Sequence, residues 1–329
     1  MRMGLSRAGE RGVVQAIALP ILLPIFLAGH AASQTPPPAQ DPDPGFRISV
    51  DVALVVMPAT VTDHQGGFVS NLAEGDFEVY ENGVRQHIRL FRNEDIPVTV
   101  GLVVDQSTSM LPKLAEVSAA AQTFVRSSNP QDEMFVVNFN EHVSLGLPGA
   151  VRFTNNTVEL ANAIVVRPAG GQTALYDAIA KALVELQAGS RDKKVLIVVS
   201  DGGDNASARS LAQVMELAGQ SNAVIYTIGV FDEDDPDRNP GVLKRLARAT
   251  GGEAFFPEHL AEIAPICDRI ARDIRHQYTI GYVPTNLTRS GVYRSIRVVA
   301  REKGHQLSVR TRTGYIFGGE PRPDSKGSK

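Results

Sequence analysis

The stretch from Val98 to Ser109, VTVGLVVDQSTS, constrains the fold more than any other part of the chain. It is a run of mostly β-branched residues that ends in an acid, which is typical of a fully buried strand in a parallel sheet. Open parallel sheets bind their ligands at the carboxyl ends of their strands. The stretch therefore predicts a ligand edge that carries Asp105, Ser107 and Ser109, whose oxygens suit a hard cation such as Mg²⁺.

From residue 97 to residue 275, stretches with strand character alternate with stretches whose apolar residues recur at helical spacing. The pattern predicts buried strands at 98–105, 134–139, 195–200 and 223–230, short strands at 143–147 and 253–256, and helices around 114–124, 158–165, 175–186, 242–249 and 258–275. Repeated strand–helix units with buried strands predict the α/β class, with a doubly wound, mainly parallel sheet that helices cover on both faces.

The sequences on either side of this region, residues 46–96 and 276–317, have the alternating pattern of β-strands. In the first flank, Asn82-Gly83 between two apolar runs indicates a tight hairpin. The predicted strands include 77–80 and 86–91 around this turn, and 277–283, 292–300 and 305–317 in the second flank. Because three strands alone make a thin core, we expect both flanks to combine into one small β-sandwich, with the α/β domain inserted between them.

The first 33 residues have the three parts of a secretory signal peptide. Three arginines precede an apolar run from Val13 to Leu27, and Ala31-Ala32-Ser33 supplies the small residues of a cleavage site. The run is short for a membrane span, which needs about 20 residues. We therefore expect a secreted or periplasmic protein with no stable membrane span after cleavage; an uncleaved N-terminal anchor is the alternative.

Two further segments are predicted to lie outside the packed core. Residues 34–45, QTPPPAQDPDPG, are expected to form a proline-rich linker, and residues 318–329 a disordered tail. The single cysteine, Cys267, excludes an internal disulfide, so packing has to stabilise an exported chain unaided. Its apolar neighbours at helical spacing predict that Cys267 is a small buried hydrophobic residue.

The charge of the chain argues against nucleic acid as a partner. The net charge is −3, and removal of residues 1–33, which carry three arginines and Glu10, takes it to −5. A mildly acidic surface does not attract polyanions. The seven histidines show no HExxH motif and no pair at metal-ligand spacing, so a zinc site is not expected.

Two more segments carry side chains that suit the predicted ligand edge. GGQTALYDAI (170–179) places Thr173 just before a helix, and SDGGDN (200–205) places Asp201 at the carboxyl end of another buried strand. Together with the DQSTS segment they supply D-x-S-x-S, a threonine and an aspartate, in that order. In this arrangement the chain resembles the von Willebrand factor type A domain with its metal-ion-dependent adhesion site, over roughly residues 97–275.

The resemblance implies a role for each of the five residues. Ser107, Ser109 and Thr173 would contact a divalent ion, whereas Asp105 and Asp201 would act mainly through water. The implied ion is Mg²⁺, with Mn²⁺ or Ca²⁺ as alternatives. Because hydroxyls leave its charge intact, the ion keeps one coordination position for a Glu or Asp of a protein partner.

The two flanks resemble those of a bacterial group of exported proteins that carry this domain. In that group a hairpin similar to FEVYENG (77–83) precedes the domain, and a motif similar to QYTIGYVPTN (277–286) follows it. The resemblance therefore implies an exported, metal-dependent protein-binding or adhesion module.

Simpler explanations exist for some of the acidic residues. Asp105 alone would fit a helix N-cap, an explanation that the presence of Thr173 and Asp201 disfavours. Asp204 is expected to be structural, since acids beside glycines favour turns. The acidic run 232–237 lacks the spacing and the glycine of an EF-hand and is expected to be a solvated loop.

Two other functions have to be separated from binding. In a structural or assembly scaffold, the metal would only rigidify the domain. In a metal-assisted hydrolase or phosphoryl-transfer protein, Asp105 would be the nucleophile. The chain has no GxSxG motif, no phosphate-binding glycine loop and no general-base histidine near the predicted site, so we do not expect an enzyme.

Overall fold

The computed structural model describes residues 54–164, 170–231, 236–288 and 291–317. The predicted signal peptide, linker and tail, and most of the acidic run 232–237, lie outside these residues. No helix within the described ranges is long and apolar enough to cross a membrane. The described residues all belong to one unit of the chain, Asp51–Lys329.

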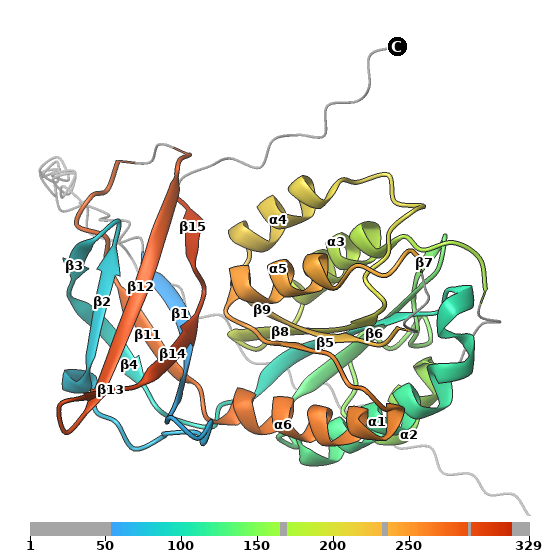
Figure 1. Cartoon of the computed structure of the whole chain (residues 1–329), viewed down its shortest axis with the longest axis horizontal. Helices are drawn as coiled ribbons and strands as arrows, with labels where there is room; N and C mark the ends of the chain where they lie inside the picture. The colour runs from blue at the N-terminus through green and yellow to red at the C-terminus, as the bar shows by residue number, and fades with distance from the viewer. Residues whose placement is uncertain (1–53, 165–169, 232–235, 289–290, 318–329) are drawn as a thin grey trace, which may run out of the picture. The chain divides into compact units, whose positions relative to one another are not determined.

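The apolar strands form a six-stranded sheet in the order β10-β9-β8-β5-β6-β7 (Figure 1). They are β5 (Val98–Asp105), β6 (Glu133–Phe139), β7 (Val143–Leu145), β8 (Lys193–Ser200), β9 (Ala223–Gly229) and β10 (Ala254–Phe255). All neighbours are parallel except β6 and β7, which form the short antiparallel hairpin that the sequence predicts. Every residue of β5 and of β9 is buried. The predicted α/β class with a mainly parallel sheet is confirmed.

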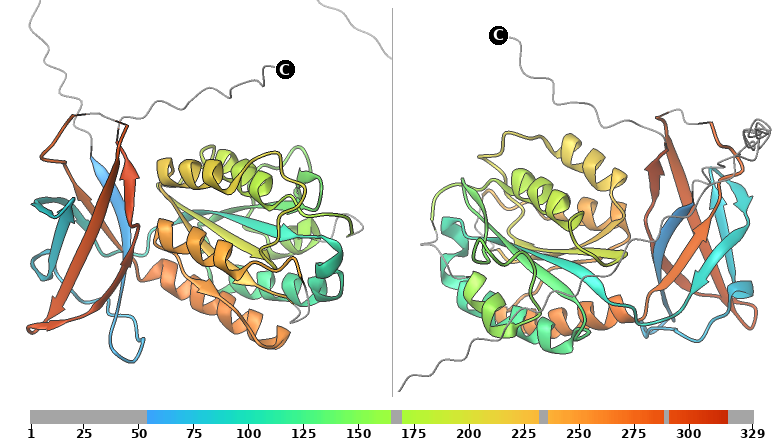
Figure 2. Two further views of the ribbon diagram at one scale, coloured as in Figure 1. Left: turned by 45° about the horizontal axis from the view of Figure 1, so that its top comes forward. Right: turned by 180° about the vertical axis from the view of Figure 1, so that it is seen from behind.

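Helices pack on both faces of this sheet (Figures 1 and 2). They are α1 (Leu114–Ser127), α2 (Thr157–Ile164), α3 (Leu175–Leu186), α4 (Leu211–Gln220), α5 (Pro240–Thr250) and α6 (Ile263–Arg275). Helix α1 contacts α2 and α6 on one face, and α4 contacts α3 and α5 on the other. Cys267 of α6 is buried, as its apolar neighbours predict.

Sequence analysis missed α4, the helix between β8 and β9. Its first turn has a capping box, in which Ser210 Oγ accepts a hydrogen bond from the amide of Gln213 (3.4 Å) and Gln213 Oε1 accepts one from the amide of Ser210 (2.8 Å). Val214 and Ala218 of this helix are buried, and Leu211 and Met215 pack against the core from partly buried positions, so its apolar residues recur at helical spacing. This spacing and the Ser-x-x-Gln pattern at the start of the helix were the signals that could have revealed it.

The strands of the two flanks pair with one another in antiparallel sheets. They are β1 (Val55–Thr62), β2 (Phe77–Glu81), β3 (Val84–Gln86), β4 (Ile88–Arg92), β11 (Tyr278–Tyr282), β12 (Tyr293–Glu302), β13 (His305–Gln306), β14 (Ser308–Thr311) and β15 (Gly314–Ile316). One sheet has the order β14-β1-β11-β4, and the other has β13-β12-β2-β3 with β15 paired to β12. Side chains of both sheets share one apolar core. This pairing agrees with the expectation that the two flanks combine.

Two of the predicted strands are each divided between sheets. The sequence predicts that 86–91 forms the second arm of the hairpin at Asn82-Gly83, whose φ values of 47° and 81° suit a two-residue turn. Instead, β3 ends at Gln86, and β4 begins at Ile88 in the other sheet. The run 305–317 similarly supplies β13, β14 and β15. A strand that changes sheets at a bend keeps its apolar character, so the sequence pattern does not show the break.

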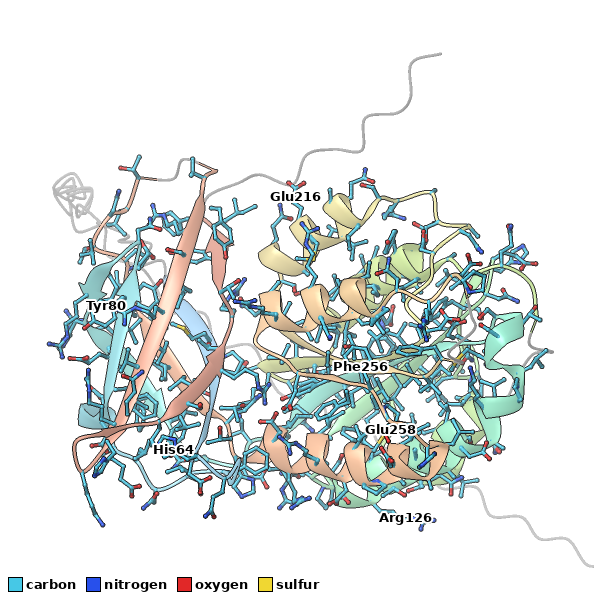
Figure 3. The ribbon with its side chains drawn as sticks, viewed as in Figure 1. His64, Tyr80, Arg126, Glu216, Phe256 and Glu258 are labelled. Carbon is cyan, nitrogen blue, oxygen red and sulfur yellow. The ribbon has the colours of Figure 1, made fainter. Side chains whose placement is uncertain are left out.

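Strand β2 illustrates how the sandwich separates its inner and outer residues. Phe77, Val79 and Glu81 are buried, whereas Glu78 and Tyr80 alternate with them and are partly exposed (Figure 3 labels Tyr80). The buried face of the strand therefore carries a charged residue, Glu81, which needs partners inside the sandwich.

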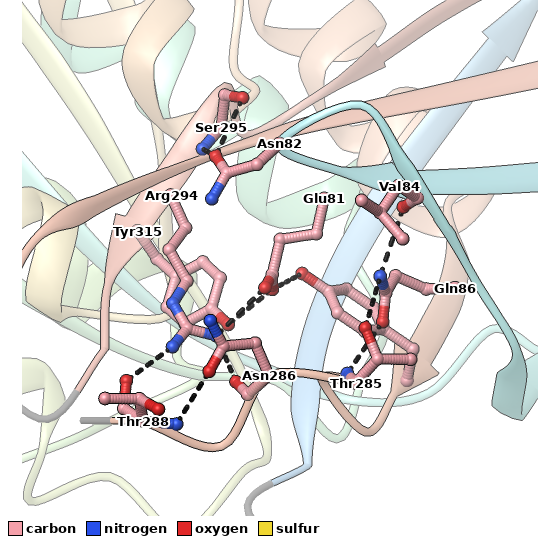
Figure 4. Close-up of polar contacts among 11 residues, drawn as sticks. Glu81, Asn82, Val84, Gln86, Thr285, Asn286, Thr288, Arg294, Ser295 and Tyr315 are labelled. Atoms are coloured by element: carbon pink, nitrogen blue, oxygen red, sulfur yellow. Dashed lines mark hydrogen bonds and ion pairs between the residues drawn. The ribbon is translucent and has the colours of Figure 1, made fainter. Parts of the chain in front are cut away.

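A buried ion pair satisfies Glu81 (Figure 4). Arg294 Nη1 lies 2.9 Å from Glu81 Oε1, and both side chains are at most 5% exposed. The other carboxylate oxygen of Glu81 accepts hydrogen bonds from the hydroxyls of Tyr282 (2.8 Å) and Tyr315 (2.7 Å). Arg294 also donates to the carbonyl of Asn286 (2.7 Å), in the loop after β11. The pair thus fixes this loop to the inner face of the sandwich, with both charges hydrogen-bonded as burial requires.

A second buried network joins the sandwich strands to the α/β region. Asp273 of α6 accepts hydrogen bonds from Thr60 Oγ1 of β1 (2.6 Å) and from the hydroxyl of Tyr226 of β9 (2.9 Å), and it pairs with Arg310 of β14. Gln277 Nε2 donates to the same Tyr226 hydroxyl (2.9 Å). Since Asp273 is 2% exposed, these contacts hold the junction through groups shielded from water.

Asp132, just before β6, makes the stability of the fold depend on pH. Its carboxylate accepts hydrogen bonds from the amides of Val98 (2.8 Å) and Asn129 (3.0 Å), and burial raises its pKa to about 6. An Asp in an unfolded chain has a pKa of about 4, so between about pH 4 and pH 6 the folded state binds a proton that the unfolded state does not bind. The contribution of this group to stability therefore falls as the pH rises through that window.

In the Asp132→Asn variant, stability should depend less on pH. Between about pH 4 and pH 6.5, its free energy of unfolding should change by about 1–2 kcal/mol less than that of the wild type, as urea unfolding at both pH values would show. The same pH profile in both proteins would contradict the assignment.

Candidate metal centre

The ends of two adjacent strands bring the first and third predicted segments together. β5 and β8 pair in parallel with Val104 opposite Val199, so Asp105 and Ser200 lie side by side. The Ser200 hydroxyl donates to Asp105 Oδ2 (2.7 Å), and the Ser107 amide donates to Asp105 Oδ1 (2.9 Å). The register of the strands and the turn after β5 thus fix this carboxylate.

The two serines and the second aspartate continue this group of oxygens. Ser107 Oγ lies 3.1 Å from Ser109 Oγ, and the Ser109 hydroxyl donates to Asp201 Oδ2 (2.6 Å). The amide of Gly203 donates to Asp201 Oδ1 (2.9 Å). The structure therefore brings Asp105, Ser107, Ser109 and Asp201 together, each in hydrogen-bond contact with at least one of the others.

Thr173, the fifth predicted residue, is held through its main chain. Its amide donates to Asn205 Oδ1 (2.8 Å), and its carbonyl accepts from the amides of Asn205 and Ala206 (both 3.0 Å). In the part of the chain that the structure describes, no hydrogen bond joins the Thr173 hydroxyl to the other four predicted residues. Asn205, which sequence analysis did not select for the site, is what links Thr173 to the loop of Asp201.

A further contact joins the two loops that carry the predicted hydroxyl ligands. The amide of Gly171 donates to Thr108 Oγ1 (3.0 Å), and the amide of Gly170 donates to the carbonyl of Gln106 (2.8 Å). Thr108 and Gln106 occupy the two variable positions of the D-x-S-x-S pattern. The pattern therefore contained no signal that would have selected either residue.

Glu141 braces the same loop and was also missed. Glu141 Oε2 accepts a hydrogen bond from the amide of Gln172 (2.8 Å). Gly171 has a φ of 88°, and a Cβ added to it would lie 1.6 Å from that oxygen. The positive φ favours glycine there, and any other residue would also displace the Glu141 carboxylate.

Loss of the Thr108 hydroxyl should loosen the loop without unfolding the protein. Thr108→Val keeps the shape of the side chain but removes the acceptor of the Gly171 amide, which should exchange with solvent at least about tenfold faster. Residue-resolved hydrogen exchange would measure this, with Thr108→Ser, which keeps the hydroxyl, as the matched control. Unchanged protection of Gly171 in the valine variant would show that the contact does not hold the loop.

Asp204 caps α3, which agrees with the structural role expected for it. The residue before this helix, Ala174, has no side-chain oxygen that could cap it. Asp204 Oδ1 instead accepts a hydrogen bond from the amide of Tyr176 (3.1 Å), and Ser207 Oγ accepts one from the amide of Asp177 (3.1 Å). The loop after β8 thus supplies the cap that the chain lacks locally.

The two carboxylates of the site are buried without a basic partner. Asp105 is fully buried and Asp201 is 2% exposed, and neither forms an ion pair within the described residues. Burial raises the pKa of Asp105 to about 6, and the charge of Asp201 acts in the same direction. Negative charge and hydroxyl oxygens together fit a hard divalent cation such as Mg²⁺.

The hydroxyls are an essential part of this donor set. No group of three or more His, Cys, Asp or Glu side chains that could hold a metal ion occurs within the described ranges. A metal ion at this edge of the sheet would therefore be held by Ser107, Ser109 and Thr173 together with the two aspartates.

The family model of the von Willebrand factor type A domain matches residues 99–266, about half of the chain. No curated protein matches the chain.

Several solved structures are similar. The von Willebrand factor type A protein from Catenulispora acidiphila is 16% identical, with 75% of each chain covered and a TM-score of 0.49. The vWF domain of the type V pili tip protein Mfa5 from Porphyromonas gingivalis is 18% identical, with 55% of this chain and 95% of that chain covered and a TM-score of 0.45. A mutant of the PilB minor pilin from Streptococcus sanguinis is 12% identical, with 55% of this chain and 62% of that chain covered and a TM-score of 0.45.

Proposed function

Because the chain belongs to the von Willebrand factor type A family, we propose that it is an exported binding module that engages a Glu or Asp of a protein partner through a divalent ion. Domains of this family often mediate protein–protein interaction or adhesion. The observation that carries the proposal is the pair of buried carboxylates, Asp105 and Asp201, which lie beside two serine hydroxyls and have no basic partner among the described residues.

Each residue has a distinct task in this proposal. Ser107, Ser109 and Thr173 would hold the ion, and Asp105 and Asp201 would balance part of its charge. When bound, Mg²⁺ supplies a coordination position for the partner's carboxylate. The hydrogen bond from Ser109 to Asp201 (2.6 Å) orients that hydroxyl, and Ser200 (2.7 Å) fixes Asp105. Hydroxyl ligands leave the ion electrophilic enough to bind an anion.

We favour binding over catalysis. Within the described residues the two serine hydroxyls contact each other, Asp201 and Asp105, and no histidine forms a hydrogen bond with them. A serine nucleophile needs an adjacent base that is itself oriented by a third group, as in Ser–His–Asp sites. The second candidate function is a scaffold that the metal only rigidifies, and the experiment below separates the two.

The test is a partner capture on the immobilised chain (residues 34–329) from surface and secreted extracts. A partner that is retained in Mg²⁺, released by excess chelator and absent from an Asp105→Ala variant with an unchanged circular dichroism spectrum supports the proposal. A partner that binds equally well in chelator refutes it. Under the scaffold alternative, chelator would lower the melting temperature and leave binding intact.

A further inference from the structure

A pocket separate from the candidate metal centre lies at the junction of the sandwich strands with the α/β region. Its volume is about 320 Å³, within the usual range of ligand sites of about 300–1,000 Å³. Strands β1, β4, β8 and β11 contribute to its walls, and so do both chain connections of the junction, at Ile96 and Gln277. The pocket adjoins the start of β8, whereas Asp201 of the candidate metal centre follows the end of that strand.

One lysine of this pocket, Lys193, forms no ion pair with a described carboxylate. Lys193 Nζ makes one long hydrogen bond, to the carbonyl of Gln277 (3.4 Å), and no described carboxylate forms an ion pair with it. Burial lowers the pKa of Lys193 to about 8, and the charges of Asp95, Asp132 and Asp273 act in the opposite direction without forming an ion pair with it. An ammonium group in such a place is destabilised unless an anion accompanies it.

The adjacent lysine, Lys194, also lines the pocket, but its ammonium group has protein partners, so it serves as a comparison. Lys194 Nζ donates to the carbonyl of Gly189 (2.8 Å) and to Thr99 Oγ1 (3.3 Å). Successive side chains of a strand point to opposite faces, which is why Lys193 and Lys194 have separate sets of partners. Both residues are lysines, and they differ in the partners of their ammonium groups.

We propose that this pocket binds a small carboxylic acid with an apolar body, whose carboxylate pairs with Lys193. Val56, Leu90 and Val224 supply apolar wall for the hydrocarbon part of such a ligand. The carboxylate supplies Lys193 with a direct ionic partner, in a charge-assisted hydrogen bond. Arg92, Lys193 and Lys194 outnumber the one carboxylate of the lining, Asp192, so the pocket favours an anion over an uncharged ligand of the same length.

The test uses octanoate as the probe and the chain 34–329 in excess chelator, so that its outcome is independent of any metal. Calorimetry should show saturable binding at one site. Lys193→Met should weaken it at least about tenfold, because the charge pair is lost, while Lys194→Met, the matched control, should change it less than about twofold. 1-Octanol should bind at least about tenfold more weakly than octanoate.

A measurement on the wild-type chain keeps the test valid if the methionine variant does not fold. Limited acetylation at pH 8, mapped by mass spectrometry, should slow at least about fivefold at Lys193 when octanoate saturates the pocket, with no change at Lys194. The proposal is overturned by the absence of saturable octanoate binding, by equal binding to Lys193→Met, by equal affinity for 1-octanol, or by unprotected acetylation of Lys193.

Discussion

The Ser107→Ala/Ser109→Ala double variant should lose at least about 100-fold in Mg²⁺ affinity and keep its fold. Loss of groups that only orient metal ligands costs about 10- to 100-fold, and these hydroxyls are proposed to be ligands themselves. Their mutual contact (3.1 Å) and the contact to Asp201 (2.6 Å) contribute about 1 kcal/mol each to the metal-free fold. Calorimetric titration of Mg²⁺, Mn²⁺ and Ca²⁺ into the metal-free chain measures the affinity, and circular dichroism checks the fold.

A hydroxyl elsewhere on the surface provides the control for this variant. Thr123 on α1 makes an exposed hydrogen bond, in which its hydroxyl donates to the carbonyl of Ala119 (3.3 Å), so Thr123→Ala should leave metal binding unchanged. If the double serine variant bound Mg²⁺ as tightly as the wild type does, the assignment of the site would be wrong. If it unfolded, the scaffold alternative would gain weight, because the hydroxyls would then matter for stability.

Glu81→Ala should destabilise the sandwich by about 3–5 kcal/mol, because removal of one member of a buried ion pair leaves the other charge unpaired. The Arg294 side chain, 5% exposed, would remain opposite the missing carboxylate, and the hydroxyls of Tyr282 and Tyr315 would lose their acceptor. Such a loss is a large part of the stability of an ordinary domain, about 5–15 kcal/mol. Unfolding in guanidinium chloride, followed by tyrosine fluorescence, measures it.

Glu78 on the same strand is the matched control. It pairs with Arg301 (2.7 Å) on the outer face, where water screens the charges, so Glu78→Ala should change stability little. The Glu81→Met/Arg294→Met double variant should be clearly more stable than Glu81→Ala, because neither charge is left alone. Similar losses in Glu81→Ala and Glu78→Ala would mean that burial does not set the strength of the pair.

Much of the α/β region could be predicted because its strands are buried on both faces. Residues 98–105, 195–200 and 223–230 are continuous apolar runs, which occur in few other settings. Helix α4 was missed although Leu211, Val214, Met215 and Ala218 stand at helical spacing and pack on the core.

The paths of the sandwich strands could not be read in the same way. At Gln86 and at Leu307 the chain leaves one strand and enters another that pairs elsewhere, and the alternating pattern continues across each break. Which neighbour a strand pairs with depends on the shape of the whole core. The pairing partner of a strand is therefore set by residues far away in the sequence, and the sequence of the strand alone does not reveal it.

The sequence by itself determined the fold class, because the burial of the strands is visible in local runs of apolar residues. It also determined the chemistry of the candidate metal centre, because short local patterns contain its predicted residues: Asp105, Ser107, Ser109, Thr173 and Asp201. Only the tertiary structure decided which residues support that site and where charges are left without partners. Thr108, Glu141 and Asn205 act through loops that lie far apart in the chain, and Lys193 forms no ion pair with a described carboxylate. Such contacts arise from the packing of distant segments, for which a local pattern carries no signal.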